Sequence, residues 1–147
     1  MKKILFICTG NVSRSAVAEC ILRTMAEREG RTDISVASAG VHNLFGQAYD
    51  PQMIATAARY GYHMEGYSRY MTSEMLQHAD FIFVMEHYHY VQAQKELPYA
   101  QRYKIHQITQ YCYGDPFNIE DPLYNDTEYD FAFHQIESCC KIILSRI

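Results

Sequence analysis

A cysteine and an arginine lie six positions apart near the start of the chain, separated by mostly small side chains. Cys8 follows an apolar run at residues 4–7, and Arg14 precedes a stretch of good helix formers. The thiolate is the reactive form of cysteine, and a helix N-terminus or a nearby guanidinium favours it. A guanidinium can bind two oxygens of a phosphate group at once. The spacing therefore predicts a nucleophile and an anion clamp in one loop.

The residues around this pair predict that the loop joins a strand to a helix. The run at 4–7 is typical of a strand buried on both faces, and apolar residues recur at helical spacing from Ser15 onward. Loop N–H groups and the positive end of a helix dipole together form a cradle for phosphate. We expect Ser15 to donate a hydrogen bond to the thiolate. The expected phosphate-binding residues are Thr9, Gly10, Asn11, Val12, Ser13, Arg14 and Ser15.

The alternative for Cys8 is a structural role, since a cysteine that ends a buried strand is usually a small buried hydrophobe. Gly10, Arg14 and Ser15 stand in register with Cys8 at a switch from strand to helix. This combination favours the nucleophile.

A leaving oxygen needs a proton, so a phosphate-cleaving thiolate requires a carboxylic acid opposite the loop. Two Asp-Pro pairs offer one, at Asp115 and Asp121. Proline restricts the local backbone and so helps to direct the preceding side chain. The residues alone do not choose between the two.

The elements that must position these groups alternate between strand and helix. Such alternation predicts one α/β domain, over residues 1–147, with a parallel sheet and helices on both faces. The site then lies at the carboxyl end of the first strand. The expected strands are 4–7, 34–38, 80–85 and 103–108; the expected helices are 15–29, 51–60 with Asp50 as N-cap, a short one opening at 72–74, 86–96 and 131–147; and 109–118 is expected to be a loop.

Two of these helices carry further expectations. His87 and His89 have a spacing that could suggest a metal site, but on a helix they lie on different faces, so we expect both to be solvated. The apolar face of the last helix is predicted to be Phe131, Ile136, Cys139, Cys140, Ile143 and Leu144.

Three separated motifs resemble the low-molecular-weight protein tyrosine phosphatase family. That family opens with a strand and Cys-x-Gly-Asn-x-Cys-Arg-Ser, matched by residues 8–15, and has Ser-Ala-Gly after its second strand, matched by 38–40. It carries an Asp-Pro motif before its last helix, matched by 121–124. The resemblance runs nearly end to end. This chain departs from the pattern at Ser13 (cysteine in the family), Ala16 (proline), Gly66 (histidine) and Leu123 (aromatic).

The resemblance implies the fold and the mechanism. The fold would be a single three-layer α/β domain with a four-stranded, parallel, twisted sheet of order 2-1-3-4. Cys8 would be the nucleophile of a phosphocysteine mechanism, Arg14 the clamp and Asp121 the general acid and base, with no metal or cofactor. The family's loop after the second strand sends an aromatic residue over the substrate ring. Leu44 or Phe45 takes that place, unless both pack beneath the loop, and Leu123 and Tyr124 complete the pocket.

The same resemblance narrows the substrate to phosphotyrosine in a protein, a tyrosine kinase being one candidate. Family members that cleave phosphoarginine carry Thr where this chain has Val12, and arsenate reductases use further cysteines that residues 73–100 lack. A phosphate-binding module without catalysis is the competing class, and the retained Cys8, Arg14 and Asp121 argue against it. We expect a monomer or a weak dimer.

Composition excludes several classes of protein. The formal net charge of −4 gives no basic footprint for nucleic acid, and no apolar run reaches the length of a membrane span. Five cysteines without a Cys-x-x-Cys spacing argue against zinc, and indicate reduced thiols in a cytoplasmic protein.

Overall fold

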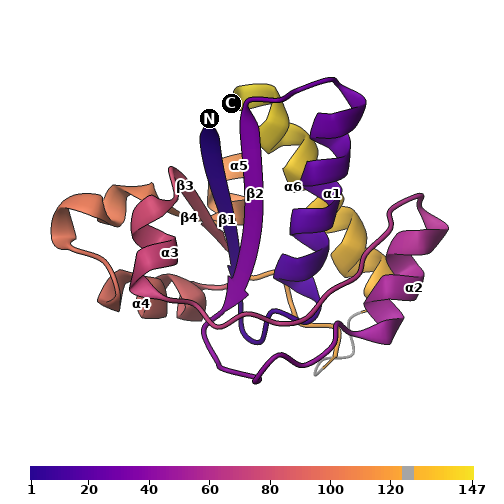
Figure 1. The fold of residues 1–147 in the computed structure, drawn as a ribbon, viewed down its shortest axis with the longest axis horizontal. Helices are drawn as coiled ribbons and strands as arrows, with labels where there is room; N and C mark the ends of the chain where they lie inside the picture. Colours follow the sequence, from indigo (N-terminus) through magenta and orange to yellow (C-terminus); the bar gives the residue numbers. More distant parts are fainter. Residues whose placement is uncertain (124–127) are drawn as a thin grey trace.

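The computed structural model describes residues 1–123 and 128–147. It contains a four-stranded, all-parallel sheet in the order β2-β1-β3-β4, with helices on both faces, as the resemblance implied (Figure 1). In chain order the elements are β1 (Lys2–Cys8), α1 (Arg14–Arg28), β2 (Ile34–Gly40), α2 (Pro51–Arg59), α3 (Ser73–His78), β3 (Phe81–Val84), α4 (His87–Lys95), the 3-10 helix η1 (Tyr99–Lys104), β4 (Ile105–Gln107), α5 (Ile108–Tyr113) and α6 (Tyr129–Arg146).

Strand β1 is the central element, paired with β2 on one side and β3 on the other. Its last five residues are buried, because alternate side chains enter the two cores on either side of the sheet. Phe6 packs towards α1 and α6, whereas Leu5 and Ile7 pack towards α3 and α4. The strand ends at Cys8, which pairs with Gly40 at the end of β2.

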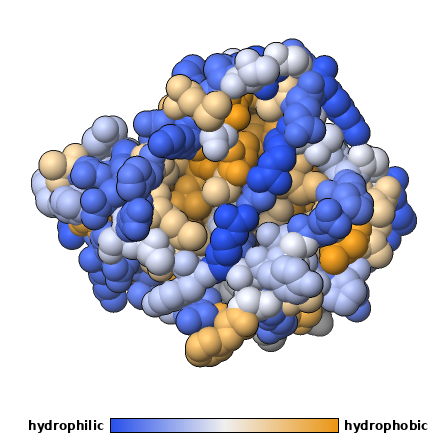
Figure 2. Space-filling view, in the orientation of Figure 1, coloured by the Kyte–Doolittle hydropathy of each residue, from blue (hydrophilic) through white to orange (hydrophobic). Residues whose placement is uncertain are grey.

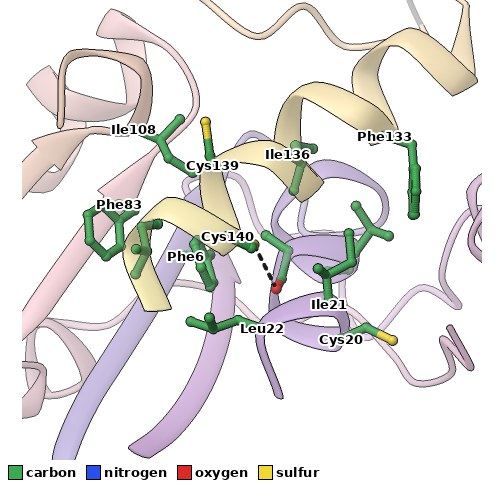
Figure 3. Close-up of a cluster of buried hydrophobic side chains, with 14 of the residues drawn as sticks. Phe6, Cys20, Ile21, Leu22, Phe83, Ile108, Phe133, Ile136, Cys139 and Cys140 are labelled. Carbon is green, nitrogen blue, oxygen red and sulfur yellow. Dashed lines mark hydrogen bonds between the residues drawn. The ribbon is translucent and has the colours of Figure 1, made fainter. Parts of the chain in front are cut away.

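Helix α6 packs on the core between α1 and the sheet, the larger of the two cores. The face that it buries differs in part from the predicted one. Figure 3 shows Phe133, Ile136 and Cys140 on the side of α6 that faces α1 and the sheet, whereas Cys139 points toward Ile108 of α5. Phe131 was predicted to lie on this face but is 60% exposed, whereas Phe133 is 0% exposed. The helix begins at Tyr129, two residues earlier than predicted, and the position of α1 and α2 decides which phenylalanine faces the core.

The region after α4 also differs from the expectation. Residues 99–104 form η1, so β4 is only three residues long, and α5 takes the first part of the predicted loop, whereas residues 114–118 are irregular as predicted. Lys104 is buried here because its Nζ donates to the carbonyl oxygens of Leu76 and Gln77 at the end of α3. In α5, Ile108 and Cys112 lie four residues apart and both face the core, which is the helical signal in this segment.

The surface seen in Figure 2 is mostly polar around one apolar hollow over β1 and β2. A groove of about 150 Å³ lies there between α3 and the sheet, lined by Lys3, Ile4, Leu5, Ser35, Ala37, Met75, His78 and Ala79. Within the described ranges, no helix has both the length and the apolar character needed to cross a membrane.

Candidate active site

The loop between Cys8 and Arg14 is folded with its carbonyl groups turned away from its centre. The carbonyl oxygens of Cys8, Thr9 and Val12 accept hydrogen bonds of 2.8–3.0 Å from backbone N–H groups that follow β2. In the described part of the chain, the N–H groups of residues 10–13 donate to no acceptor. Unpaired buried N–H groups are rare in proteins, and several that line one loop bind anions.

Asn11 holds this loop in shape. Its backbone is left-handed, with φ 57°, a conformation that asparagine tolerates better than most residues. The side chain is buried and fully paired: Oδ1 accepts from the N–H of Arg69, and Nδ2 donates to the hydroxyls of Ser15 and Ser38. The loop is therefore tied to α1, to β2 and to the segment around Arg69.

Gly40 permits the loop to lie against β2. A Cβ at this position would lie 2.7–2.9 Å from backbone atoms of Thr9, Gly10 and Asn11, closer than such contacts occur in proteins. The Ser-Ala-Gly motif thus places a hydroxyl beneath the loop at Ser38 and removes a side chain where the two backbones meet.

A chain of hydrogen bonds runs from a buried carboxylate to Cys8. Ser38 donates its hydroxyl hydrogen to Glu19 at 2.7 Å and accepts from Asn11 at 2.9 Å. Asn11 also donates to Ser15 at 2.8 Å, and Ser15 Oγ lies 2.9 Å from Cys8 Sγ. The Ser15 hydroxyl has two acceptors within reach, the Cys8 sulfur at 2.9 Å and the carbonyl oxygen of Ala39 at 3.4 Å, so a hydrogen bond to the sulfur is the shorter of the two. That hydrogen bond stabilises a thiolate.

Arg14 is 1% exposed and is held through one end of its guanidinium. Nη1 donates to Glu86 Oε2 at 2.5 Å and to the carbonyl of Ile119 at 2.7 Å. Nη2 lies at longer distances, 3.2 Å from Thr9 Oγ1 and 3.5 Å from Asp121 Oδ2. Nε has no hydrogen-bond partner among the described residues. The Nε–Nη2 edge is therefore the one that an anion can take.

The structure brings Asp121, and not Asp115, to the loop. The carboxylate of Asp121 lies beside Arg14, and its Oδ1 also accepts from the N–H of Leu123 at 3.0 Å. Asp115 is exposed in the bend after α5 and, within the described ranges, makes no contact with the loop. The Asp-Pro pair singled out by the resemblance is thus the one beside the arginine.

The predicted pocket residues are placed differently from one another. Leu44 lies against Gly10, where an added Cβ would be 2.6 Å from Leu44 Cδ1. Phe45, with φ 53°, is 88% exposed and does not pack beneath the loop. Leu123 is exposed and lies two residues after Asp121, and Tyr124 lies outside the described residues. Of the two candidates in the loop after β2, Leu44 is the one that contacts the phosphate cradle.

His89 is a residue of the site that the sequence interpretation placed wrongly in solvent. It is fully buried at the third position of α4, where Nε2 lies 2.9 Å from Thr9 Oγ1 and Nδ1 accepts from the N–H of Glu86. Burial, with the nearby charges of Arg14 and His42, lowers the pKa of His89 to about 3. His87 is exposed, as predicted.

Two signals in the sequence pointed to this part of the site. Glu86 follows β3, next to β1, and the carboxyl ends of adjacent parallel strands meet at the ligand-binding edge. Glu86 is also the N-cap of α4, and a side chain three residues after an N-cap often accepts from its N–H. His89 occupies that place.

The other cysteines lie in the core. All five thiols are free and buried, and burial raises the pKa of Cys20 and Cys140. Figure 3 shows Cys139 and Cys140 on α6, with the hydrogen bond from Cys140 to the carbonyl of Ala18. No three His, Cys, Asp or Glu side chains of the described ranges lie close enough to hold a metal ion.

The fold and this loop define a class: an α/β protein in which a loop of unpaired N–H groups, as far as the described residues show, follows a cysteine at the end of the first strand. A family model described as "Low molecular weight phosphotyrosine protein phosphatase" matches residues 3–147. The chain belongs to this family, whose members are hydrolases.

This chain is also similar to individual proteins over most of their length. The low molecular weight phosphotyrosine protein phosphatase of Rattus norvegicus is 27% identical, over 99% of this chain and 95% of its own. A protein-arginine-phosphatase of Bacillus subtilis is 30% identical, over 81% of this chain and 78% of its own. A crystal structure of protein tyrosine phosphatase from Entamoeba histolytica, with Hepes in its active site, superposes with a TM-score of 0.87 at 25% identity, covering 99% and 96% of the two chains.

Proposed function

We propose that this protein hydrolyses phosphotyrosine in proteins, and small aryl phosphates, through a phosphocysteine on Cys8. One observation carries the proposal: the N–H groups of residues 10–13 and the Nε of Arg14, for which the described residues offer no acceptor, belong to the loop that starts at the Cys8 sulfur. A bound phosphoryl group supplies the acceptors that these donors lack. Preorganised donors of this kind stabilise the transition state of phosphoryl transfer.

The reaction takes two steps. The Cys8 thiolate attacks phosphorus in line with the ester bond, so that the S–P bond forms as the P–O bond breaks and Asp121 gives its proton to the departing oxygen. Asp121 then takes a proton from water, whose oxygen attacks phosphorus and releases inorganic phosphate and the thiolate. Arg14 and the loop N–H groups hold the equatorial oxygens in both steps, and Ser15 stabilises the departing thiolate.

An aryl phosphate suits the residues around the loop better than an alkyl guanidine phosphate does. Val12 and Leu44 are apolar, and Leu44 lies directly on the loop at Gly10. Apolar walls stabilise a phenyl ring by removing its surface from water. Phosphoarginine is the alternative, since one relative is a protein-arginine-phosphatase. In that branch of the family a threonine stands at the position of Val12.

The decisive test compares three phosphopeptides of one sequence that carry phosphotyrosine, phosphoserine or phosphoarginine. We expect kcat/KM to be highest for phosphotyrosine, with hydrolysis of p-nitrophenyl phosphate that EDTA leaves unchanged and vanadate blocks. Cys8→Ser is expected to abolish turnover, because a hydroxyl ionises far less readily than a thiol. An active Cys8→Ser enzyme contradicts the covalent route, and a preference for phosphoarginine reassigns the substrate.

A matched pair of variants, one at each Asp-Pro carboxylate, tests which aspartate is the general acid. Asp121→Asn is expected to lower kcat for p-nitrophenyl phosphate by about 10²- to 10⁴-fold, the usual contribution of a general acid. Asp115→Asn removes the other Asp-Pro carboxylate and is expected to change kcat by less than about twofold. The opposite pattern moves the acid to Asp115.

We also propose a cytoplasmic setting, with a phosphotyrosine-bearing protein as substrate. The five free, buried thiols support a reducing compartment.

A further inference from the structure

His89 and Thr9 form a hydrogen-bonded pair beside Arg14 that the scheme above does not use. The Nδ1 of His89 accepts from the N–H of Glu86 at 3.0 Å, so in the neutral ring the hydrogen is on Nε2. Nε2 lies 2.9 Å from Thr9 Oγ1 and therefore donates to it. Backbone geometry at the start of α4 thus fixes the tautomer of a buried histidine.

Thr9 receives a second hydrogen bond at the same oxygen. Arg14 Nη2 lies 3.2 Å from Thr9 Oγ1 and 3.5 Å from Asp121 Oδ2. A hydroxyl oxygen accepts two hydrogen bonds, so His89 and Arg14 together use its full acceptor capacity. Thr9 therefore contacts the guanidinium at the nitrogen that lies beside the acid.

We propose that His89 and Thr9 are positioning residues that hold the Nη2 edge of Arg14 in place for the transferred phosphoryl group. The proposal rests on the function proposed above. Glu86 and Ile119 both bind Nη1, so these two hydrogen bonds hold one nitrogen and leave the Nη2 edge to other contacts. Thr9 restrains the opposite edge, and His89 restrains Thr9. A fixed guanidinium needs no reorganisation when charge develops on the phosphoryl oxygens.

The neutral state of His89 is required for this arrangement. A protonated ring carries hydrogens on both nitrogens, so Nδ1 could no longer accept from Glu86 N–H. Among the described residues, the charged or titratable groups that face the ring are Arg14 from α1, His42 from the loop after β2, the Glu86 carboxylate at the N-cap of α4, and Tyr88 of α4. Burial, followed by the electrostatic effects of Arg14 and His42, lowers the pKa of His89 to about 3, so the ring is neutral at neutral pH.

The test uses substitutions that keep or remove single hydrogen bonds. Thr9→Val and His89→Leu each remove the hydrogen bond between Thr9 and His89. Thr9→Ser keeps the hydroxyl, and His89→Gln keeps one acceptor and one donor. We expect Thr9→Val and His89→Leu each to lower kcat for p-nitrophenyl phosphate about tenfold, the effect of one hydrogen bond, with KM changed less than about twofold. Thr9→Ser and His89→Gln should remain within about threefold of the wild type.

The double variant tests whether the two residues act as one unit. Thr9→Val with His89→Leu is expected to lose about tenfold in kcat, as each single variant does, because each substitution already breaks the same link. A hundredfold loss, the product of two independent effects, overturns the proposal. So does a His89→Leu enzyme with wild-type kcat.

A stability control separates positioning from folding. His89→Leu also leaves the Glu86 N–H without its partner, which weakens the start of α4. Thr72→Ala removes a comparable cap from α3, where Thr72 Oγ1 accepts from the N–H of Met75. We expect similar losses of unfolding free energy in urea for the two variants, and a kcat loss only for His89→Leu. A kcat loss of equal size in Thr72→Ala would make the effect of His89 a structural one and overturn the proposal.

The affinity for orthovanadate reports on the position of Arg14 without the need for turnover. Calorimetry is expected to show about tenfold weaker binding to Thr9→Val and to His89→Leu, with Thr9→Ser and His89→Gln close to the wild type; unchanged binding in the first two overturns the proposal. Failure of the proposed function is seen differently, as a wild-type protein that binds vanadate but does not hydrolyse p-nitrophenyl phosphate.

Discussion

At the scale of single residues, the site depends on groups whose hydrogen-bonding capacity is only partly used. Arg14 has two strong partners at Nη1, two longer contacts at Nη2 and, among the described residues, none at Nε. Ser15 accepts from Asn11, and its Oγ lies nearer to the Cys8 sulfur, at 2.9 Å, than to the carbonyl oxygen of Ala39, at 3.4 Å. Each group is held firmly at one point and left open at another, and the open points belong to the same loop.

Replacing Arg14 by lysine is expected to lower kcat/KM for p-nitrophenyl phosphate by about 10²- to 10³-fold. Lysine keeps the positive charge but offers a single ammonium in place of the fork, so it cannot hold Glu86 and two phosphoryl oxygens together. Arg31→Lys is the control, because Arg31 forms an ion pair with Asp33 just before β2, at the opposite end of the sheet from the loop. Steady-state kinetics that give equal values for the two variants would remove Arg14 from the role of clamp.

His89 predicts a dependence of stability on pH. Its folded-state pKa, about 3, lies below the ordinary value of 6.5, so the unfolded chain binds the proton more readily. The stabilisation from the neutral ring is complete above about pH 7 and is lost as the pH falls from 6.5 towards 3. Between pH 7.5 and pH 5, the wild type should lose about 2 kcal/mol of unfolding free energy more than His89→Gln does. Urea titrations at the two pH values measure this difference, and parallel losses would contradict it.

At the scale of elements, the loop is shaped by β2 as much as by the residues within it. Gly40 admits the loop backbone, Ser38 reaches Asn11 from below, and the N–H of Arg69 holds the Asn11 carbonyl. These contacts within the protein define the shape of the loop. Such preorganisation increases affinity because less conformational entropy is lost on binding.

Asn11→Ala is expected to lower the free energy of unfolding by about 3 kcal/mol. Three hydrogen bonds are lost, two hydroxyls and one N–H lose a partner, and alanine adopts a left-handed backbone at a cost of about 1 kcal/mol. Chemical denaturation measures the change. Asn43→Ala is the control, since exposed Asn43 makes one hydrogen bond to the N–H of Phe45 and should lose less than about 1 kcal/mol. Equal losses would show that the loop is not anchored through Asn11.

At the scale of the whole molecule, two separate cores hold β1 between them. The larger core contains α1, α2, α5 and α6, and the smaller contains α3 and α4 (Figure 1). Burial on both faces fixes the end of β1, and with it the position of Cys8 under the loop. The stability of α6 against α1 is thus connected to the geometry of a site that α6 itself does not enter.

Two phenylalanines on α6 provide a matched test of this packing. Phe133→Ala removes a fully buried ring and is expected to cost about 3–5 kcal/mol of unfolding free energy, whereas Phe131→Ala should cost less than about 1 kcal/mol. Denaturant titrations with equal m-values in both variants measure the difference. A larger loss for Phe131 would restore the face of α6 that the sequence predicted.

The sequence alone was sufficient to predict the features that depend on residues close together along the chain. The apolar run before Cys8, the spacing to Arg14, the Asp50-Pro51 helix start and the alternation of strands and helices gave the fold class, and family resemblance gave the sheet order. These features are local, since a buried strand, a helix cap or a phosphate loop is defined by a few consecutive residues.

Only the tertiary structure decided which distant residues meet. Helical spacing left His89 in solvent, yet the approach of α4 to β1 buries it against Thr9, eighty residues earlier in the chain. The same holds for Glu86 on Arg14, for Leu44 over Gly10, and for Phe133 in place of Phe131. Periodicity gives the faces of a helix, but which face is buried depends on elements far away in the sequence, and those contacts complete the site.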